Sequence, residues 1–121
     1  MHDPKEPTEI QENDLPPTGL ELIIAERERQ ITQEGWSKER DAAEHQNGEL
    51  AMAAACYAFD AVALPTIDAK RFVFDNWPWS RKWWKPTPDD PIRQLTKAGA
   101  LIAAEIDRRQ GEHNKRWPDA R

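Results

Sequence analysis

Cysteine is nearly absent from this sequence of 121 residues, whose one thiol belongs to Cys56. A lone cysteine cannot form an internal disulfide, which favours a reducing compartment, and its alanine-rich surroundings predict a small buried side chain. Long hydrophobic runs are also absent. None approaches the ~18 apolar residues of a membrane span, and the N-terminus lacks the basic-then-apolar order of a signal peptide. We therefore expect a cytoplasmic protein without a membrane partner.

Positive charge is in deficit, with 17 Lys and Arg against 22 Asp and Glu and a formal net charge of −5. This balance argues against a protein that covers DNA or RNA with positive potential, so we do not expect a nucleic-acid partner. Hydrophobic residues make up 38% of the chain, which allows one compact core at most. The charge is also uneven, because residues 1–18 carry −4, residues 19–69 carry −6 and residues 70–85 carry +4.

The composition divides the chain into three parts. Residues 1–18 hold four prolines, five acids and almost nothing apolar, which cannot offset the entropy of ordering. We predict a disordered acidic tail there, with a partner-binding arm as the alternative. A helical bundle domain follows over residues 19–110, and residues 111–121 form a C-terminal tail. Within the domain, residues 65–91 form a long Trp/Pro-rich loop.

Three segments have helical patterns, over residues 20–34, 49–64 and 92–109. Both later helices are rich in small residues, so we expect them to pack closely against each other. The first has a stripe that we expect to face the core, formed by Leu20, Ile23, Ile24, Arg27 and Ile31. No hairpin signal is visible. The predicted fold class is all-α, a small helical bundle of three main helices.

The Trp/Pro-rich loop contains an unusual cluster, because residues 77–86 hold four tryptophans and three cations. Such a mixture suits stacking on a nucleobase, contact with a protein partner or cation–π interaction. Alternatively, the indoles fill gaps that alanine-rich helices leave. Residues 71–74 are compatible with a short helical turn or a strand, and the prolines exclude any long element.

Carboxylates are the first candidates for chemistry, because helical bundles often build sites from acids on facing helices. His45 and Glu49 are four residues apart and could share an ion if the helix extends back to His45. Otherwise Glu49 is an N-terminal helix acid and His45 belongs to a loop. Glu26 and Glu105 lie beside apolar stripes and could point inward. Lys97 could reach an anionic ligand or extend to the surface.

The motif order resembles small proteins of phages and prophages and, more distantly, the MazG-like all-α nucleoside triphosphate pyrophosphohydrolases. The resemblance covers about residues 20–109. It rests on Glu26-Arg-Glu-Arg-Gln30, Gly35-Trp36, Gly48-Glu49-Leu50-Ala51 and the run from Leu95 to Ile106. In that superfamily, two adjacent glutamates and a third after two spacers act with a later Glu-x-x-Asp to hold magnesium over the triphosphate. The resemblance therefore implies a Mg²⁺ cofactor and a nucleoside triphosphate substrate.

This sequence matches only part of the family's motifs. Gly48-Glu49-Leu50 matches, but His45 and Gln46 stand where the adjacent glutamates belong, and Gln94-Leu-Thr-Lys97 stands for Glu-x-x-Asp. Only Glu49 remains as a metal ligand, and Mg²⁺ prefers several oxygen ligands. Either Glu26, Glu105 or Asp107 completes the site, or this is a relative with a reduced set of metal ligands. A lysine in place of an acid could contact a phosphate.

Two functions follow from these patterns. The first is a MazG-like pyrophosphohydrolase or nucleotide-binding relative of phage or prophage origin. In it Glu49 would bind metal, His45 and Glu26 would support catalysis, and Lys97, Trp83 and Trp84 would contact the nucleotide. The second is a non-enzymatic phage accessory protein that binds and modulates a host protein. Small-residue helices and exposed tryptophans, together with the family resemblance, favour a homodimer.

Overall fold

The computed structural model describes residues 15–34, 45, 47–62 and 68–116. Within these ranges the chain forms helices and no strand, which confirms the predicted all-α class. The helices are α1 (Gly19–Glu34), α3 (Glu49–Ala61), α4 (Ala69–Asn76) and α5 (Pro91–Arg116), with a 3-10 turn η2 (Arg81–Trp83) before α5. The predicted acidic tail lies outside the described residues except for Leu15–Thr18, which are exposed.

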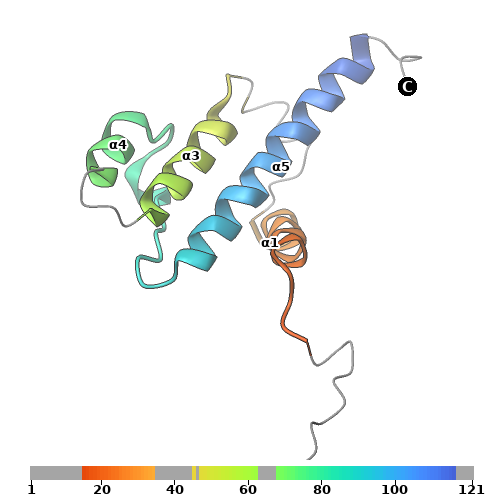
Figure 1. The fold of residues 1–121 in the computed structure, drawn as a ribbon. Coiled ribbons are helices and arrows are strands. Elements are labelled where there is room, and N and C mark those ends of the chain that lie inside the picture. Colours follow the sequence, from red (N-terminus) through yellow and green to blue (C-terminus); the bar gives the residue numbers. More distant parts are fainter. Residues whose placement is uncertain (1–14, 35–44, 46, 63–67, 117–121) are drawn as a thin grey trace, which may run out of the picture.

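Helices α3 and α5 form the centre of the molecule, with α1 and α4 on opposite sides of the pair (Figure 1). Their small faces allow the close approach that the sequence predicts. The core cluster consists of Leu50, Ala53, Ala54, Tyr57, Ala98, Leu101 and Ala104. Cys56 is fully buried beside it, and burial raises the pKa of its thiol to about 11, so it is not a nucleophile near neutral pH.

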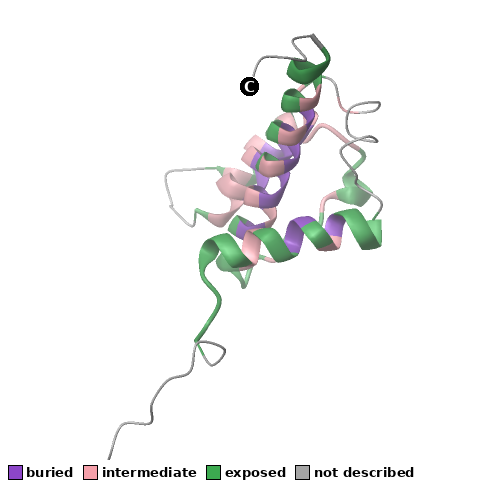
Figure 2. Ribbon diagram, turned by 90° about the vertical axis from the view of Figure 1, so that its right-hand side faces the viewer, coloured by how far each residue is buried: buried purple, intermediate pink, exposed green. Residues whose placement is uncertain are grey.

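Helix α1 packs across α5 and makes no contact with α3 among the described residues. Its orientation agrees with the prediction in part. Of the predicted core stripe, Arg27 is buried and Ile23 is half-buried against Gly99 of α5, whereas Leu20, Ile24 and Ile31 are exposed. The other buried residues of α1 are the polar Glu26 and Gln30, and Figure 2 shows α1 largely exposed with short buried stretches. The buried side includes Glu26 because Arg93 of α5 pairs with it, as described below.

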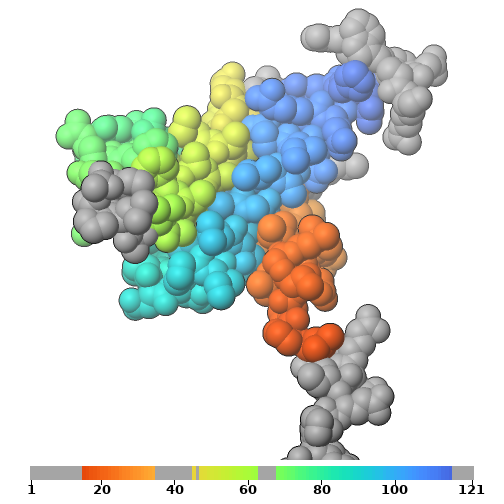
Figure 3. All heavy atoms as spheres, viewed as in Figure 1, coloured from red at the N-terminus to blue at the C-terminus, as the bar shows by residue number. Residues whose placement is uncertain are grey.

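Helix α4 lies inside the segment predicted as a loop. Asp68 caps its N-terminus, because the Asp68 carboxylate accepts a hydrogen bond from the backbone N–H of Arg71 at 2.9 Å. The ring of Phe72 stacks on Phe59 of α3, with centroids 4.1 Å apart. Figure 3 shows α4 on the flank of α3 away from α1. The N-cap and the stacked pair of rings together stabilise this short helix.

Helix α5 is longer than predicted, since it continues past Arg109 to Arg116 and includes part of the predicted C-terminal tail. A buried ion pair stabilises its second half: Arg108, 3% exposed, donates to Glu105 at 2.7 Å and to Glu112 at 2.6 Å. The described helices include none that is long and apolar enough to cross a membrane.

Candidate functional site

A cavity of about 630 Å³ is lined by residues of α1, α3 and α5 and of the segment around η2. We call it the charged cavity. Its walls come from every part of the described fold except α4, and they combine four cations, two acids and two aromatic rings. The lining includes Glu26, Arg29, Gln30, Glu34, Tyr57, Trp83, Lys85, Arg93 and Lys97. Three predicted site residues, Glu26, Lys97 and Trp83, therefore meet here from three different elements.

Glu26 organises one wall of the cavity. Its side chain is 1% exposed, and its Oε1 lies 2.7 Å from Arg29 Nε and 2.7 Å from Arg93 Nη2. Gln30 also donates to Oε2 at 3.2 Å. Burial alone would raise the pKa of Glu26, but the hydrogen bonds and charges of Arg29 and Arg93 lower it below its ordinary value. Glu26 is therefore a fixed anion that positions two guanidinium groups.

Lys97 lies on α5, one helical turn after Arg93. Its Nζ donates to the backbone oxygen of Lys85 at 2.6 Å and lies 5.4 Å from the centre of the Tyr57 ring. Burial, reinforced by the charge of Arg93, lowers the pKa of Lys97 from its ordinary value. An ammonium has three donors, so the bond to Lys85 leaves capacity for an anion in the cavity. A lysine that is desolvated beside another cation gains from such a ligand.

The aromatic parts of the site differ in exposure. Trp83 is 55% exposed at the cavity, and Lys82 Nζ lies over its ring, 5.3 Å from the centroid. Trp84, the neighbouring predicted ligand contact, turns away and packs on Tyr57, with centroids 4.6 Å apart. It does not line the charged cavity. The gap-filling alternative is confirmed for Trp77, Trp79 and Trp84, which pack against the core, and ligand contact stays a prediction for Trp83.

His45 and Glu49 lie together at the start of α3 and do not line the charged cavity. Helix α3 begins at Glu49 after Gly48, whose φ of 83° ends any extension toward His45. Partial burial raises the pKa of Glu49, but bonds from the backbone N–H groups of Glu49 and Asn47 and the charge of His45 lower it below its ordinary value. His45 contacts Trp79 instead, with ring centroids 5.1 Å apart.

The described donor set does not fit Mg²⁺. Over residues 15–34, 45, 47–62 and 68–116, no three side chains of His, Cys, Asp or Glu gather at one point. The acids proposed to complete a site are each paired with arginine: Glu26 with Arg29 and Arg93, Glu105 with Arg108, and Asp107 with Arg27 at 3.8 Å. Glu49 alone supplies too little negative charge.

The two ends of Gln94-Leu-Thr-Lys97, which stands for Glu-x-x-Asp, lie in different surroundings. Gln94, 1% exposed, is structural, because its amide donates to Asp60 at 2.7 Å and accepts from the Thr87 backbone N–H at 2.7 Å. Lys97 at the other end of the motif reaches the cavity. A cation therefore stands at the cavity where the family that the sequence resembles would place a carboxylate.

The sequence analysis missed Arg29, Arg93 and Lys85 as site residues. Arg29 lies among alternating charges that are typical of a solvated face. Arg93 carried a usable signal, because a cation in the first turn of a helix opposes the helix dipole and needs a specific partner. That partner is Glu26, 67 positions earlier in the sequence.

No protein-family model, curated protein or solved structure matches this chain.

Proposed function

We propose that this protein binds a nucleoside phosphate in the charged cavity, as a nucleotide-binding relative of the MazG-like family with a reduced set of metal ligands. The observation that carries the proposal is the meeting of Lys97, Arg93 and Trp83 around one cavity of about 630 Å³. This volume lies in the range of small-molecule sites. Cations on the walls with an open indole at the rim match a ligand that joins phosphates to a planar base.

The roles of the residues follow from their positions. Lys97 and Lys85 supply ammonium groups, and Arg93 supplies a planar guanidinium whose orientation Glu26 fixes. Lys85 has no ion pair within the described part of the chain. Lys82 lies over one face of the Trp83 ring, and the other face would stack on the base, which is worth about 1–3 kcal/mol per base. In this arrangement cationic side chains take the phosphate-binding role that Mg²⁺ has in the related family.

Titration calorimetry of the full chain tests this proposal, with the common deoxynucleoside triphosphates and inorganic tripolyphosphate as ligands, in EDTA and in Mg²⁺. We expect binding in EDTA. Lys97→Ala should weaken both ligand types about tenfold, because a hydrogen bond to a charged group is worth about 1.5–3 kcal/mol. Trp83→Ala should weaken only the nucleotides. Lys115→Ala on the exposed end of α5 is the control and should change nothing.

Two outcomes would contradict the proposal. One is no binding of any nucleotide at millimolar concentration, with no rise in melting temperature. The other is release of pyrophosphate in Mg²⁺ that Glu49→Gln abolishes and Lys97→Ala leaves intact. That result would make the protein a hydrolase centred on Glu49 and His45.

We also propose that the chain forms a homodimer. The support is a row of exposed apolar side chains on α5, at Ile92, Leu95, Ile102 and Ile106, and a second row on α1, at Leu20, Ile24 and Ile31. Single exposed apolar residues are normal, but several on one side of a helix are characteristic of an interface. The steps along α5 are three, seven and four residues, which keeps these side chains on one side of the helix, on either side of Gly99, where Ile23 of α1 packs.

A further inference from the structure

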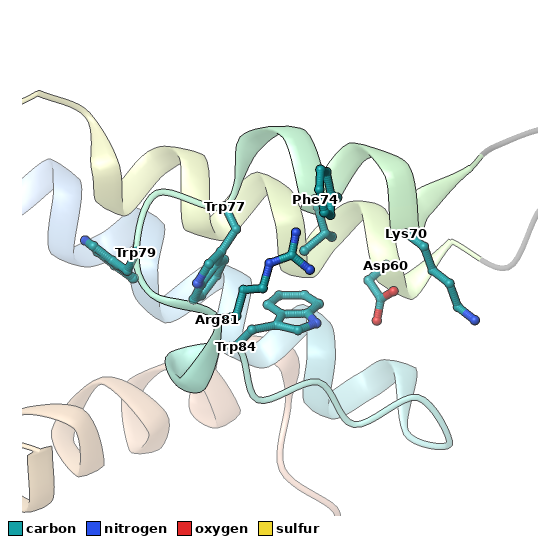
Figure 4. Close-up of a pocket in the computed structure, with 8 residues that line it drawn as sticks. Asp60, Lys70, Phe74, Trp77, Trp79, Arg81 and Trp84 are labelled. Carbon is teal, nitrogen blue, oxygen red and sulfur yellow. The ribbon is translucent and has the colours of Figure 1, made fainter.

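A second cavity, of about 480 Å³, lies on the other side of the α3–α5 pair, between α3, α4 and the segment around η2 (Figure 4). We call it the aromatic groove. It shares no lining residue with the charged cavity. Its lining includes Asp60, Lys70, Phe74, Trp77, Arg81 and Trp84. The nucleotide proposal does not involve any of them.

The floor of the groove is a rigid pair of indoles. Trp77 and Trp84 meet edge to face with centroids 4.9 Å apart, and both contact Tyr57, at 5.7 and 4.6 Å. The Trp77 indole N–H donates to the backbone oxygen of Ser80 at 3.1 Å. Both rings are half-buried, so each covers the core and also borders the groove. A pre-formed aromatic floor binds an apolar side chain with little loss of conformational entropy.

The rim of the groove is positively charged. The Arg81 guanidinium lies 4.0 Å above the ring of Phe74, which is 63% exposed (Figure 4). Among the described residues, neither Arg81 nor Lys70 has a carboxylate partner. The one acid of the groove, Asp60, accepts a hydrogen bond from Gln94 at 2.7 Å. The segment over residues 70–85 carries +4 in a chain whose net charge is −5.

We propose that the aromatic groove binds an acidic peptide segment of another protein, with one large apolar side chain placed on Trp77 and Trp84. Carboxylates of that segment pair with Arg81 and Lys70, whose charges are otherwise unmatched. The volume admits one or two large side chains and not a folded surface. Asp60 favours peptide over nucleic acid, because its carboxylate can accept hydrogen bonds from peptide N–H groups, whereas a phosphodiester backbone offers only acceptors.

Selection from a display library of random dodecapeptides against the full chain tests the proposal. We expect the enriched peptides to combine Asp or Glu with Trp, Phe or Leu. Arg81→Glu should weaken a selected peptide at least about tenfold, as expected when one charged contact is reversed. Phe74→Ala should weaken it several-fold. Both sites are exposed, so the far-ultraviolet circular dichroism should not change. Lys115→Glu makes the same charge change far from the groove and should leave affinity within about twofold.

Three outcomes would overturn the proposal: no enriched peptide distinguishes Arg81→Glu from the parent chain, the enriched peptides lack acids, or single-stranded oligothymidine displaces them and binds more tightly. The third result would assign the groove to nucleic acid. Because Arg81→Glu leaves the charged cavity unchanged, nucleotide titration of the same variant keeps failure of this proposal separate from failure of nucleotide binding.

Discussion

Glu26 is the residue on which the α1–α5 contact depends electrostatically. A buried carboxylate is costly unless it is paired and hydrogen-bonded, and Glu26 meets both conditions through Arg29, Arg93 and Gln30. Arg29 comes from the same helix, but Arg93 comes from the first turn of α5. The ion network therefore ties the orientation of α1 to α5 and at the same time shapes one wall of the charged cavity.

Glu26→Gln should destabilise the fold because it leaves two arginines without their buried anion. Breaking a fully buried pair costs roughly 3–5 kcal/mol. Arg29 and Arg93 are about one third exposed, so we expect roughly 2–3 kcal/mol here. Urea unfolding measures the loss. The isosteric amide retains the side-chain volume. An unchanged free energy of unfolding would therefore show that the ion network orients the arginines without stabilising the fold.

The same substitution should change the acid limb of the stability curve. The pKa of Glu26 is lower in the folded protein than its ordinary value of 4.5, so its stabilisation is present above that value and disappears as pH falls through the folded pKa. The parent chain should lose this contribution below about pH 4.5, while Glu26→Gln lacks it at every pH. Melting temperatures of the two proteins should therefore converge as the pH is lowered.

At the scale of elements, the sequence predicted the positions of helices that have faces of small residues or that begin at a proline. Gly48 precedes α3 and Pro91 begins α5, and the alanine-rich faces of the two helices pack together as predicted. Helix α3 ends at Ala61, before the predicted end at residue 64. The orientation of α1 was not predictable from periodicity, because its apolar stripe and its charged face both have helical spacing. The choice between them depends on Arg93, which pattern reasoning on α1 alone cannot include. Helix α4 likewise depends on stacking of Phe72 against α3.

The candidate site was predictable to the same degree. Glu26, Lys97 and Trp83 were each recognisable as unusual, but their meeting in one cavity depends on the crossing of α1 over α5. Sequence spacing placed Glu49 beside His45, and the two are close, but neither lines the cavity. The resemblance pointed to the start of α3 and to Lys97, and of these positions only Lys97 lines the cavity.

The α1–α5 crossing depends on Gly99. A Cβ added at this position would lie 2.5 Å from Ile23 Cδ1 and 2.7 Å from Ile23 Cγ1, closer than atoms can pack. Gly111, in the same helix, has no such neighbour within 4 Å. Alanine in place of glycine stabilises a helix interior by up to about 1 kcal/mol, so the two positions form a matched pair.

Gly111→Ala should therefore stabilise the protein, whereas Gly99→Ala should destabilise it by about 1 kcal/mol or more through overpacking. In an Ile23→Ala background the clash is gone, and Gly99→Ala should become stabilising. Denaturant unfolding of the four proteins in this double-mutant cycle gives the coupling energy directly. If Gly99→Ala stabilises the parent chain as much as Gly111→Ala does, the helices do not cross at this contact.

At the scale of the whole molecule, the charges and apolar rows are separated in space. The acidic half of the chain contains α1 and α3, and the basic segment over residues 70–85 contains α4 and η2. The charged cavity lies on the α1 side of the α3–α5 pair and the aromatic groove on the α4 side. Both can therefore be occupied at once, and the exposed rows of α1 and α5 remain available to a second copy.

The homodimer proposal predicts that sedimentation velocity at micromolar concentration gives twice the chain mass of 14.0 kDa. Ile102 is 49% exposed near the middle of the α5 row, so Ile102→Glu should place a charge inside the interface and yield monomers. Met52 on α3 is 39% exposed and lies outside both rows, which makes Met52→Glu the matched control that should remain dimeric. A 14.0 kDa monomer from the parent chain would refute the dimer and leave nucleotide binding unaffected, because no residue of the α5 row lines the charged cavity.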